Sequence, residues 1–215
     1  MKIKEEILKT YNKIAGNYDK EFCQKIYYFN ELTFFLKQLP KKAKILDVGC
    51  GSGHVAKYLE QKGFMVTGID FSGKMLQITK KRCKKAKFIK TDIEKFYYGK
   101  EKWDGIIALF ILIHLKKTNI EKVLNKFHKS LRQNGLLFLS MVKGRGEYFG
   151  PEPLNPKLKM FFRYTTKKEI QLFLKKAGFQ IIKLKEILLC TTHEKQVEFF
   201  IVARKSNQTK PRKIN

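Results

Sequence analysis

Apolar residues recur at spacings of three and four along the first part of the chain. This spacing places them on one face of a helix. Pro40 and the two lysines after it predict the end of this helical region, residues 1–40, because proline cannot continue a helix. The residues of the apolar face are Phe22, Ile26, Phe29, Leu32, Leu36 and Leu39.

From residue 44 onward, short apolar runs alternate with segments of helical pattern. Strands are predicted at residues 44–48, 65–69, 87–90, 103–110 and 136–142. Helices are predicted at residues 52–61, 72–85 and 119–131, and Asn134-Gly135 predicts a turn before the fifth strand. The alternation indicates an α/β protein, in which a parallel sheet carries helices on both faces.

The last third of the chain has a different pattern. A helix at 166–177 is predicted to end at Gly178, and strands at 179–189 and 196–203 follow it. Too few residues separate these two strands for a parallel crossover, so we expect them to pair antiparallel. Residues 143–165, rich in glycine, proline and aromatic residues, leave the carboxyl end of the fifth strand, where open parallel sheets bind ligands. They are expected to form one wall of a substrate pocket.

The composition is that of a globular protein with one substantial core: 43% of the 215 residues are hydrophobic. No apolar run reaches the roughly 18 residues of a membrane helix, and the first residues lack the apolar stretch of a signal peptide. We therefore expect no membrane span and a cytoplasmic location. The expected organisation is a helical lid at 1–40, a domain at 41–204 and a basic, frayed tail at 205–215, with no oligomeric state predicted.

The cysteine pattern argues against a metal centre. None of the four cysteines forms a C-x-x-C pair, and none lies near a histidine at zinc spacing. We interpret them as buried or incidental thiols and expect no metal.

The net charge of +27 is the unusual feature of the composition. Clustered basic residues attract nucleic-acid phosphates, so RNA is one candidate partner. The 40 lysines and 6 arginines are scattered, however, and specific phosphate recognition favours arginine. We favour compositional drift and a small-molecule partner, with a polyanionic partner left open.

A glycine-rich turn joins the first strand to the helix after it. Its sequence is Asp47-Val48-Gly49-Cys50-Gly51-Ser52-Gly53, and glycines let the backbone approach a ligand closely. His54 stands where a dinucleotide-binding turn has its third glycine. A carboxylate at Asp47 would repel a pyrophosphate but suits a ligand with an ammonium group, which disfavours a nicotinamide cofactor.

Two further acidic residues follow the second and third strands. Asp70 at the end of the second strand can accept both hydroxyls of a ribose. Asp92 follows the third strand, where it can accept a hydrogen bond from an adenine amino group or cap a helix. Because parallel strands end at one edge of the sheet, we expect these carboxylates and Asp47 to gather there.

These motifs resemble those of the class I S-adenosylmethionine-dependent methyltransferase superfamily, nearest its small-molecule branch, which includes enzymes of the ubiquinone and menaquinone pathways. The resemblance covers nearly the whole chain. One departure is Gln133-Asn134-Gly135, which replaces a usual Pro-Gly-Gly. The other matching stretches are Tyr11-Asn12-Lys13-Ile14-Ala15 with Tyr18-Asp19, Asp70-Phe71-Ser72-Gly73-Lys74-Met75-Leu76, Trp103-Asp104, His114-Leu115 and Phe162-Arg163-Tyr164.

The resemblance implies a Rossmann-like sheet of seven strands in the order 3-2-1-4-5-7-6, with the last strand antiparallel. It implies S-adenosyl-L-methionine as cofactor, with Gly49 and Gly51 against its methionine part, Asp70 on the ribose and Asp92 near the adenine. The implied cofactor-binding residues are Tyr11, Tyr18, Asp47, Gly49, Gly51, Asp70, Phe71, Met75, Asp92, Ile93 and Leu109.

The expected chemistry is in-line transfer of a methyl group to an unidentified acceptor. His114 is the candidate base, with a packing role as the alternative, and Arg163 and Tyr164 are candidate acceptor-binding residues. An RNA methyltransferase, a non-catalytic cofactor-binding module and an NAD-dependent oxidoreductase remain as other functions, the last disfavoured. The other histidines, His54, His128 and His193, are expected at the surface, away from the site.

Overall fold

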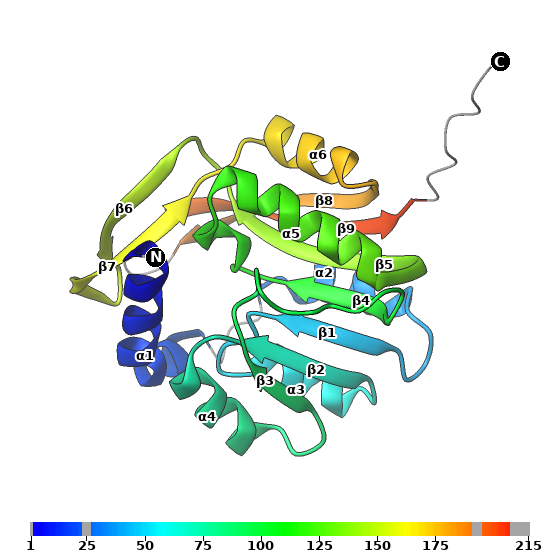
Figure 1. Ribbon diagram of the computed structural model, residues 1–215, viewed down its shortest axis with the longest axis horizontal. Coiled ribbons are helices and arrows are strands. Elements are labelled where there is room, and N and C mark those ends of the chain that lie inside the picture. The colour runs from blue at the N-terminus through cyan, green and yellow to red at the C-terminus, as the bar shows by residue number, and fades with distance from the viewer. Residues whose placement is uncertain (1, 23–26, 191–194, 207–215) are drawn as a thin grey trace.

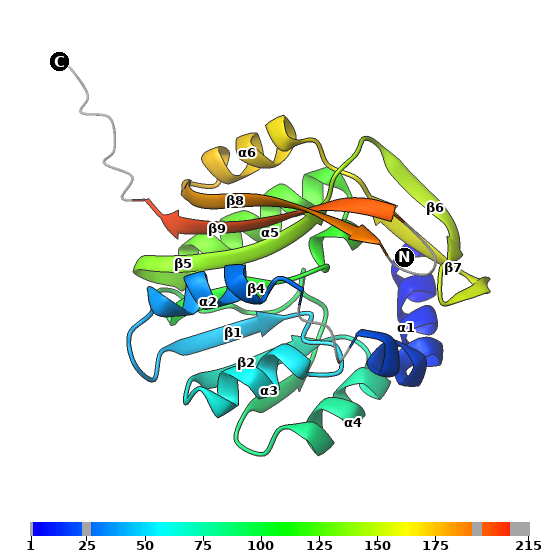
Figure 2. The ribbon, with the colours of Figure 1, turned by 180° about the vertical axis from the view of Figure 1, so that it is seen from behind.

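A computed structural model describes residues 2–22, 27–190 and 195–206. Its main sheet has seven strands in the order β3-β2-β1-β4-β5-β9-β8, and a separate two-stranded sheet pairs β6 with β7 (Figures 1 and 2). The main-sheet strands are β1 (Lys44–Val48), β2 (Met65–Asp70), β3 (Lys87–Lys90), β4 (Trp103–Ala108), β5 (Leu131–Val142), β8 (Phe179–Cys190) and β9 (Lys195–Lys205).

The strand directions match the prediction. Strands β1 to β5 pair in parallel with their neighbours. Strand β9 is antiparallel to both β5 and β8. Counted without the β6–β7 hairpin, the order is 3-2-1-4-5-7-6 with the seventh strand antiparallel, so the α/β fold class is confirmed.

Helices cover both faces of this sheet. Residues of α5 and α6 pack with one face in the larger core, which includes Phe127 and Phe173. Residues of α2 and α3 pack on the other face around Phe35 and Phe138. The helices are α1 (Lys2–Phe22), α2 (Phe29–Lys37), α3 (His54–Gln61), α4 (Gly73–Arg82), α5 (Lys117–Ser130) and α6 (Lys167–Lys176), with a short 3₁₀ helix, η1 (Leu112–His114).

Local signals set two of the helix starts as predicted. The Ser72 hydroxyl accepts a hydrogen bond from the Met75 N–H at the start of α4. Thr166 and Glu169 form a reciprocal capping box at the start of α6. Gly178, with a φ of +83°, follows the end of α6, as expected of a glycine stop.

The structure corrects three boundaries. The first 40 residues form two helices, with α1 ending before residues 23–26, so Ile26 and Cys23 lie outside the described residues. Strand β5 begins at Leu131, and Asn134, with a φ of +61°, therefore lies within the strand rather than in a turn before it. Lys205, assigned to the tail, lies in β9, whereas residues 207–215 lie outside the described part.

A β-hairpin occupies the segment after β5 for which no regular structure was predicted. Strands β6 (Glu147–Glu152) and β7 (Asn155–Arg163) pair antiparallel. Its prolines hid this hairpin in the sequence, because proline cannot donate to a sheet ladder. In a two-stranded sheet both strands are edge strands, and edge strands accommodate prolines. The prolines are Pro151, Pro153 and Pro156.

The hairpin and α1 stand together at the carboxyl ends of the parallel strands (Figure 1). The Thr10 hydroxyl of α1 donates to the Lys159 carbonyl of β7, 2.9 Å away. Two segments distant in sequence therefore enclose the edge of the sheet where the acidic residues gather. None of the helices in the described ranges is both long enough and apolar enough to cross a membrane.

Candidate active site

The turn between β1 and α3 depends on its glycines. Gly49, Gly51 and Gly53 have φ values of +71°, +51° and +82°, a region that side chains disfavour. A Cβ on Gly49 would also lie 2.8 Å from the Ile111 side chain, whereas one on Gly51 would meet no atom within 4 Å. The turn therefore keeps an open space beside its backbone.

Asp70, at the end of β2, braces this turn. Its Oδ2 accepts from the Gly51 N–H at 2.9 Å, and its Oδ1 accepts from the Ser72 N–H at 2.8 Å. Burial raises the pKa of Asp70 despite these hydrogen bonds. Each carboxylate oxygen can accept a second hydrogen bond, so Asp70 retains the capacity to bind a diol.

Asp47, at the start of the turn, is a buried carboxyl with an unmet requirement. Within the described part of the chain, its Oδ2 has no hydrogen-bond partner. Burial, and secondarily the charge of Asp70, raises the pKa of Asp47 to about 7. A buried carboxylate without a partner is costly, and a cationic ligand would satisfy it.

Asp92 makes a different set of contacts from those predicted. Its Oδ1 accepts from the Glu94 N–H at 2.8 Å and closes a turn after β3, where no helix of the described residues begins, so Asp92 is not the helix cap that the sequence left open. Its Oδ2 pairs with Lys4 Nζ of α1 at 2.7 Å, and Lys4 also pairs with Glu94. Partial burial pushes the pKa of Asp92 upward, but Lys4 and the Glu94 N–H outweigh it and hold the pKa below its usual value.

A small pocket of about 40 Å³ lies where these groups meet. Lys4 and Ile7 of α1 form part of its wall. Ordinary small-molecule sites measure about 300–1,000 Å³, so this pocket is narrow with α1 in its present place. It is lined by Lys4, Ile7, Gly49, Asp70, Phe71, Asp92, Ile93, Ile111, His114 and Leu115.

His114 in η1 is buried and bonded at both ring nitrogens. Its Nδ1 lies 2.8 Å from the Phe161 carbonyl oxygen, and its Nε2 lies 2.7 Å from the Tyr11 hydroxyl. Burial lowers the pKa of His114 to about 4, although the bond to Phe161 opposes this shift. The side chain is therefore a neutral imidazole at neutral pH, fixed between α1 and β7.

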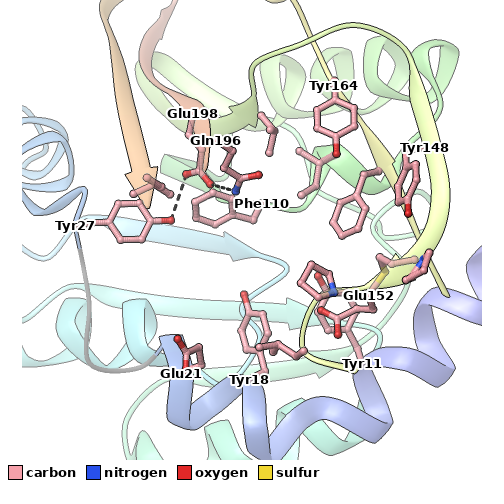
Figure 3. Close-up of a pocket in the computed structure, with 18 of the residues that line it drawn as sticks. Tyr11, Tyr18, Glu21, Tyr27, Phe110, Tyr148, Glu152, Tyr164, Gln196 and Glu198 are labelled. Atoms are coloured by element: carbon pink, nitrogen blue, oxygen red, sulfur yellow. Dashed lines mark hydrogen bonds between the residues drawn. The ribbon is translucent and has the colours of Figure 1, made fainter. Parts of the chain in front are cut away.

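A second, larger cavity of about 270 Å³ opens on the other side of Tyr11. Figure 3 shows the aromatic and acidic side chains around it, which come from α1, the β6–β7 hairpin, β9 and the connecting segments that carry Tyr27, Phe110 and Tyr164. The Tyr11–His114 contact joins the two spaces, because Tyr11 lines the larger one and His114 the smaller. The larger cavity is lined by Tyr11, Tyr18, Glu21, Tyr27, Tyr28, His54, Phe110, Ile113, Val142, Tyr148, Pro151, Glu152, Pro153, Leu154, Met160, Phe162, Tyr164, Leu189, Gln196 and Glu198.

Phe110 stands in this cavity with an unusual backbone. Its φ is +55°, which is uncommon for a bulky residue and costs roughly 1–2 kcal/mol. Its N–H donates to the Ser140 hydroxyl, 2.8 Å away, which helps to hold the conformation. Strain of this kind is concentrated at functional sites.

Glu198 of β9 is a functional candidate that the sequence analysis missed. Its side chain lies at the cavity wall and accepts from the Tyr27 hydroxyl at 3.2 Å and the Gln196 amide at 2.8 Å (Figure 3). Burial raises the pKa of Glu198 to about 8. One sequence signal could have found it: a glutamate that interrupts the apolar run of residues 197–203.

The predicted site residues divide between the two spaces. Gly49, Asp70, Phe71, Asp92, Ile93 and His114 line the smaller pocket, whereas Tyr11, Tyr18 and Tyr164 line the larger cavity. Asp47 and Gly51 belong to the turn beside the smaller pocket without lining it. Met75 and Leu109 line neither; Met75 is buried and Leu109 packs against the core around Phe138.

Two residues have surroundings that differ from those predicted. Arg163 is buried and forms ion pairs at 3.0 Å with Glu147 and with Glu169, so it links the hairpin to α6 instead of facing an acceptor. His54 was expected at the surface, but it lines the larger cavity and its Nε2 lies 3.2 Å from the Tyr28 hydroxyl.

Comparison with known proteins places this site in context. The sequence model of a family described as "Methyltransferase domain" matches residues 20–184. A demethylmenaquinone methyltransferase of Thermotoga maritima is 28% identical over 146 residues, which cover 64% of this chain and 62% of that protein. A ubiquinone biosynthesis O-methyltransferase of Pelagibacter ubique is 30% identical over 139 residues, 63% of this chain and 55% of that protein. The chain thus spans less than two thirds of the length of these curated relatives.

The fold is also similar to solved structures. One is the 1,6-didemethyltoxoflavin-N1-methyltransferase of Burkholderia thailandensis, crystallised with 1,6-didemethyltoxoflavin and S-adenosylhomocysteine. The TM-score is 0.76 at 17% identity, and the match covers 94% of this chain and 88% of that one. This likeness establishes the fold shared by the two proteins.

Proposed function

Since the chain belongs to the methyltransferase domain family, we propose that it transfers a methyl group from S-adenosyl-L-methionine to a small-molecule acceptor. The observation that carries this proposal is the carboxyl pair at the glycine turn. Asp47 has a buried oxygen without a partner, and Asp70 retains free acceptor capacity. An ammonium group and a ribose meet these two requirements, whereas a pyrophosphate would meet like charge at Asp47.

The residues of the small pocket have chemistry suited to each part of this cofactor. Asp47 would hold its ammonium group, Asp70 its ribose hydroxyls, and Ile93 with Asp92 its adenine. The open space beside Gly51 would admit its methionine part. When bound, the cofactor supplies an electrophilic methyl group on a sulfonium.

The rest of the chain has to orient the acceptor and exclude water. The larger cavity suits this role, because it is concave, lined by many aromatic and aliphatic side chains and adjacent to the cofactor pocket through Tyr11. His114 holds the Tyr11 hydroxyl, so we assign it a positioning role at this junction in place of the predicted base. Tyr164 remains a candidate acceptor contact.

We further propose that α1 acts as a lid over both spaces. Lys4 of this helix pairs with Asp92 and Glu94 beside the small pocket, and Tyr11 and Tyr18 close one side of the larger cavity. The narrowness of the small pocket supports this role, since withdrawal of α1 would widen it. The lid at residues 1–40, the domain at 41–204 and a cytoplasmic location stay predictions.

An RNA acceptor is the second candidate, on account of the charge of +27. The larger cavity gives it less support, because none of its described lining residues is a lysine or arginine. The proposal is tested by incubation of the protein with labelled cofactor and fractionated cell extract. We expect label in the small-molecule fraction, whereas label in RNA alone would favour the second candidate.

A further inference from the structure

The larger cavity has a charge opposite to that of the protein. The chain carries 46 basic and 19 acidic residues. Yet the charged side chains among the described lining residues are all carboxylates: Glu21, Glu152 and Glu198. The described lining therefore attracts positive charge, in contrast to the protein as a whole.

Glu198 is the most deeply placed of these acids. Its exposed fraction is only 1%, and its register partners, Val142 of β5 and Ile187 of β8, are apolar. Its two hydrogen-bond partners, the Tyr27 hydroxyl and the Gln196 amide, are both uncharged. Among the described residues no cation pairs with it, although a buried carboxylate without a counter-charge is costly.

The aromatic lining adds a second attraction for positive charge. Tyr27 packs edge-on against Tyr28 with ring centroids 5.3 Å apart, and Phe110 lies beside Tyr28 at 6.2 Å. Tyr18 and Tyr148 face the same space from α1 and from the hairpin (Figure 3). Aromatic faces attract cations through their quadrupole, so the rings of this cavity add to the attraction that its acids have for an amine.

We propose that the acceptor carries an organic amine group, whose protonated nitrogen is bound by the Glu198 carboxylate beside the aromatic rings of the cavity. This ammonium has no lone pair, so it anchors the acceptor while the methyl group goes to another, nucleophilic atom of the same molecule. The inference rests on the proposed function, since it names the class of molecule that the larger cavity admits. Glu198 thereby acts as the specificity-determining residue of the site. The cavity would disfavour carboxylates and phosphates, because their charge has the same sign as that of its lining.

The protonation of Glu198 gives the inference a pH signature. A cation pairs with the ionised carboxylate, and burial holds the pKa of Glu198 at about 8 before the ligand arrives. Below pH 8, amine affinity should therefore increase by up to about tenfold for each unit by which the pH is raised, and binding should release a proton from Glu198. The other titratable groups facing the cavity are Tyr11, Tyr18, Glu21, Tyr27, Tyr28, His54, Tyr148, Glu152 and Tyr164.

Three probes of similar shape test the inference: phenethylamine, 2-phenylethanol and phenylacetate. They are titrated by calorimetry into the protein, both free and saturated with S-adenosylhomocysteine. We expect the amine to bind at least about tenfold more tightly than the alcohol, with phenylacetate the weakest. Equal affinities, no binding by any probe, or a preference for phenylacetate would overturn the inference.

Glu198→Gln is the decisive variant, because it keeps the shape of the side chain and a hydrogen-bonding group. It should abolish both the preference for the amine and its pH dependence. Glu121→Gln, which removes an acid of α5 paired with Lys176, is the matched control and should leave both unchanged. An amine preference that persists in Glu198→Gln would exclude Glu198 as the specificity residue.

Two further measurements make the outcomes distinguishable. Glu198→Gln should still bind S-adenosylhomocysteine. If the parent protein fails to bind S-adenosylhomocysteine, the proposed function is contradicted, whereas the inference about Glu198 is judged by the three probes. Folding of the variant is read from thermal unfolding. Because the pKa of Glu198 is raised in the folded state, the carboxyl loses its stabilising contribution as the pH rises from about 4.5 to about 8. The variant should therefore gain stability relative to the parent across that range.

Discussion

The Tyr11 hydroxyl lies 2.7 Å from Nε2 of His114 and fixes the state of that ring. On the other side of the ring, Nδ1 lies 2.8 Å from the Phe161 carbonyl, which only accepts hydrogen bonds. The proton therefore belongs on Nδ1, and Nε2 accepts from Tyr11. A histidine held in this way orients a tyrosine at the junction of the two spaces.

Replacement of His114 by glutamine should change the response of stability to acid. The pKa of His114 is about 4 in the folded protein and about 6.5 when unfolded, so the unfolded state binds more protons between these values. The stability due to the neutral ring is complete above pH 6.5 and falls by about 3 kcal/mol towards pH 4. Denaturant unfolding of both proteins from pH 7 to 4 measures this contribution.

The difference between the two proteins isolates His114 from other groups that titrate in this range. His54 has a similarly lowered pKa, whereas Asp47 has a raised one, and both are common to the two proteins. We expect the difference in the free energy of unfolding between the parent protein and His114→Gln to decrease as the pH falls. Parallel curves would mean that His114 titrates normally and is not held as a neutral ring.

Cofactor binding should discriminate sharply by chemical class. We expect S-adenosylmethionine and S-adenosylhomocysteine to bind and NAD not to bind, because Asp47 offers a carboxylate where NAD would bring a pyrophosphate. Isothermal titration calorimetry with the three ligands checks this expectation. Binding of NAD alone would refute both the cofactor and the proposed reaction.

Asp70→Ala should weaken cofactor binding by roughly 10- to 150-fold. Hydrogen bonds to a charged group contribute about 1.5–3 kcal/mol, which corresponds to this range of dissociation constants. Asp104→Ala is a matched control, since its carboxylate also accepts from a backbone N–H, that of Lys44. The measurement is calorimetric affinity for S-adenosylhomocysteine, and a folded Asp70→Ala protein with unchanged affinity would exclude the ribose contact.

Arg163→Met should act on stability and not on ligand binding. The variant loses two ion pairs, to Glu147 and to Glu169, and we expect the free energy of unfolding to fall by about 1.5–3 kcal/mol. Denaturant unfolding measures this loss. Affinity for S-adenosylhomocysteine should be unchanged, and an unchanged free energy of unfolding would exclude the structural role of Arg163.

The sheet and the acidic edge could be predicted because their signals are local. Strand periodicity indicated a parallel sheet, which brings Asp47, Asp70 and Asp92 to one edge, whereas the strand order was implied by the family resemblance and is the order observed. The partner of Asp92 could not be foreseen, since Lys4 lies 88 positions away. Glu198 was hidden for the same reason: its burial depends on β5, β8 and Tyr27, none adjacent in sequence.

Helix α1 contributes to the walls of both spaces, with Lys4 and Ile7 at one and Tyr11 and Tyr18 at the other. One helix thus lines both the smaller pocket and the larger cavity. Its opening would govern exchange at both sites together, so residence times of the two ligands would be correlated rather than independent.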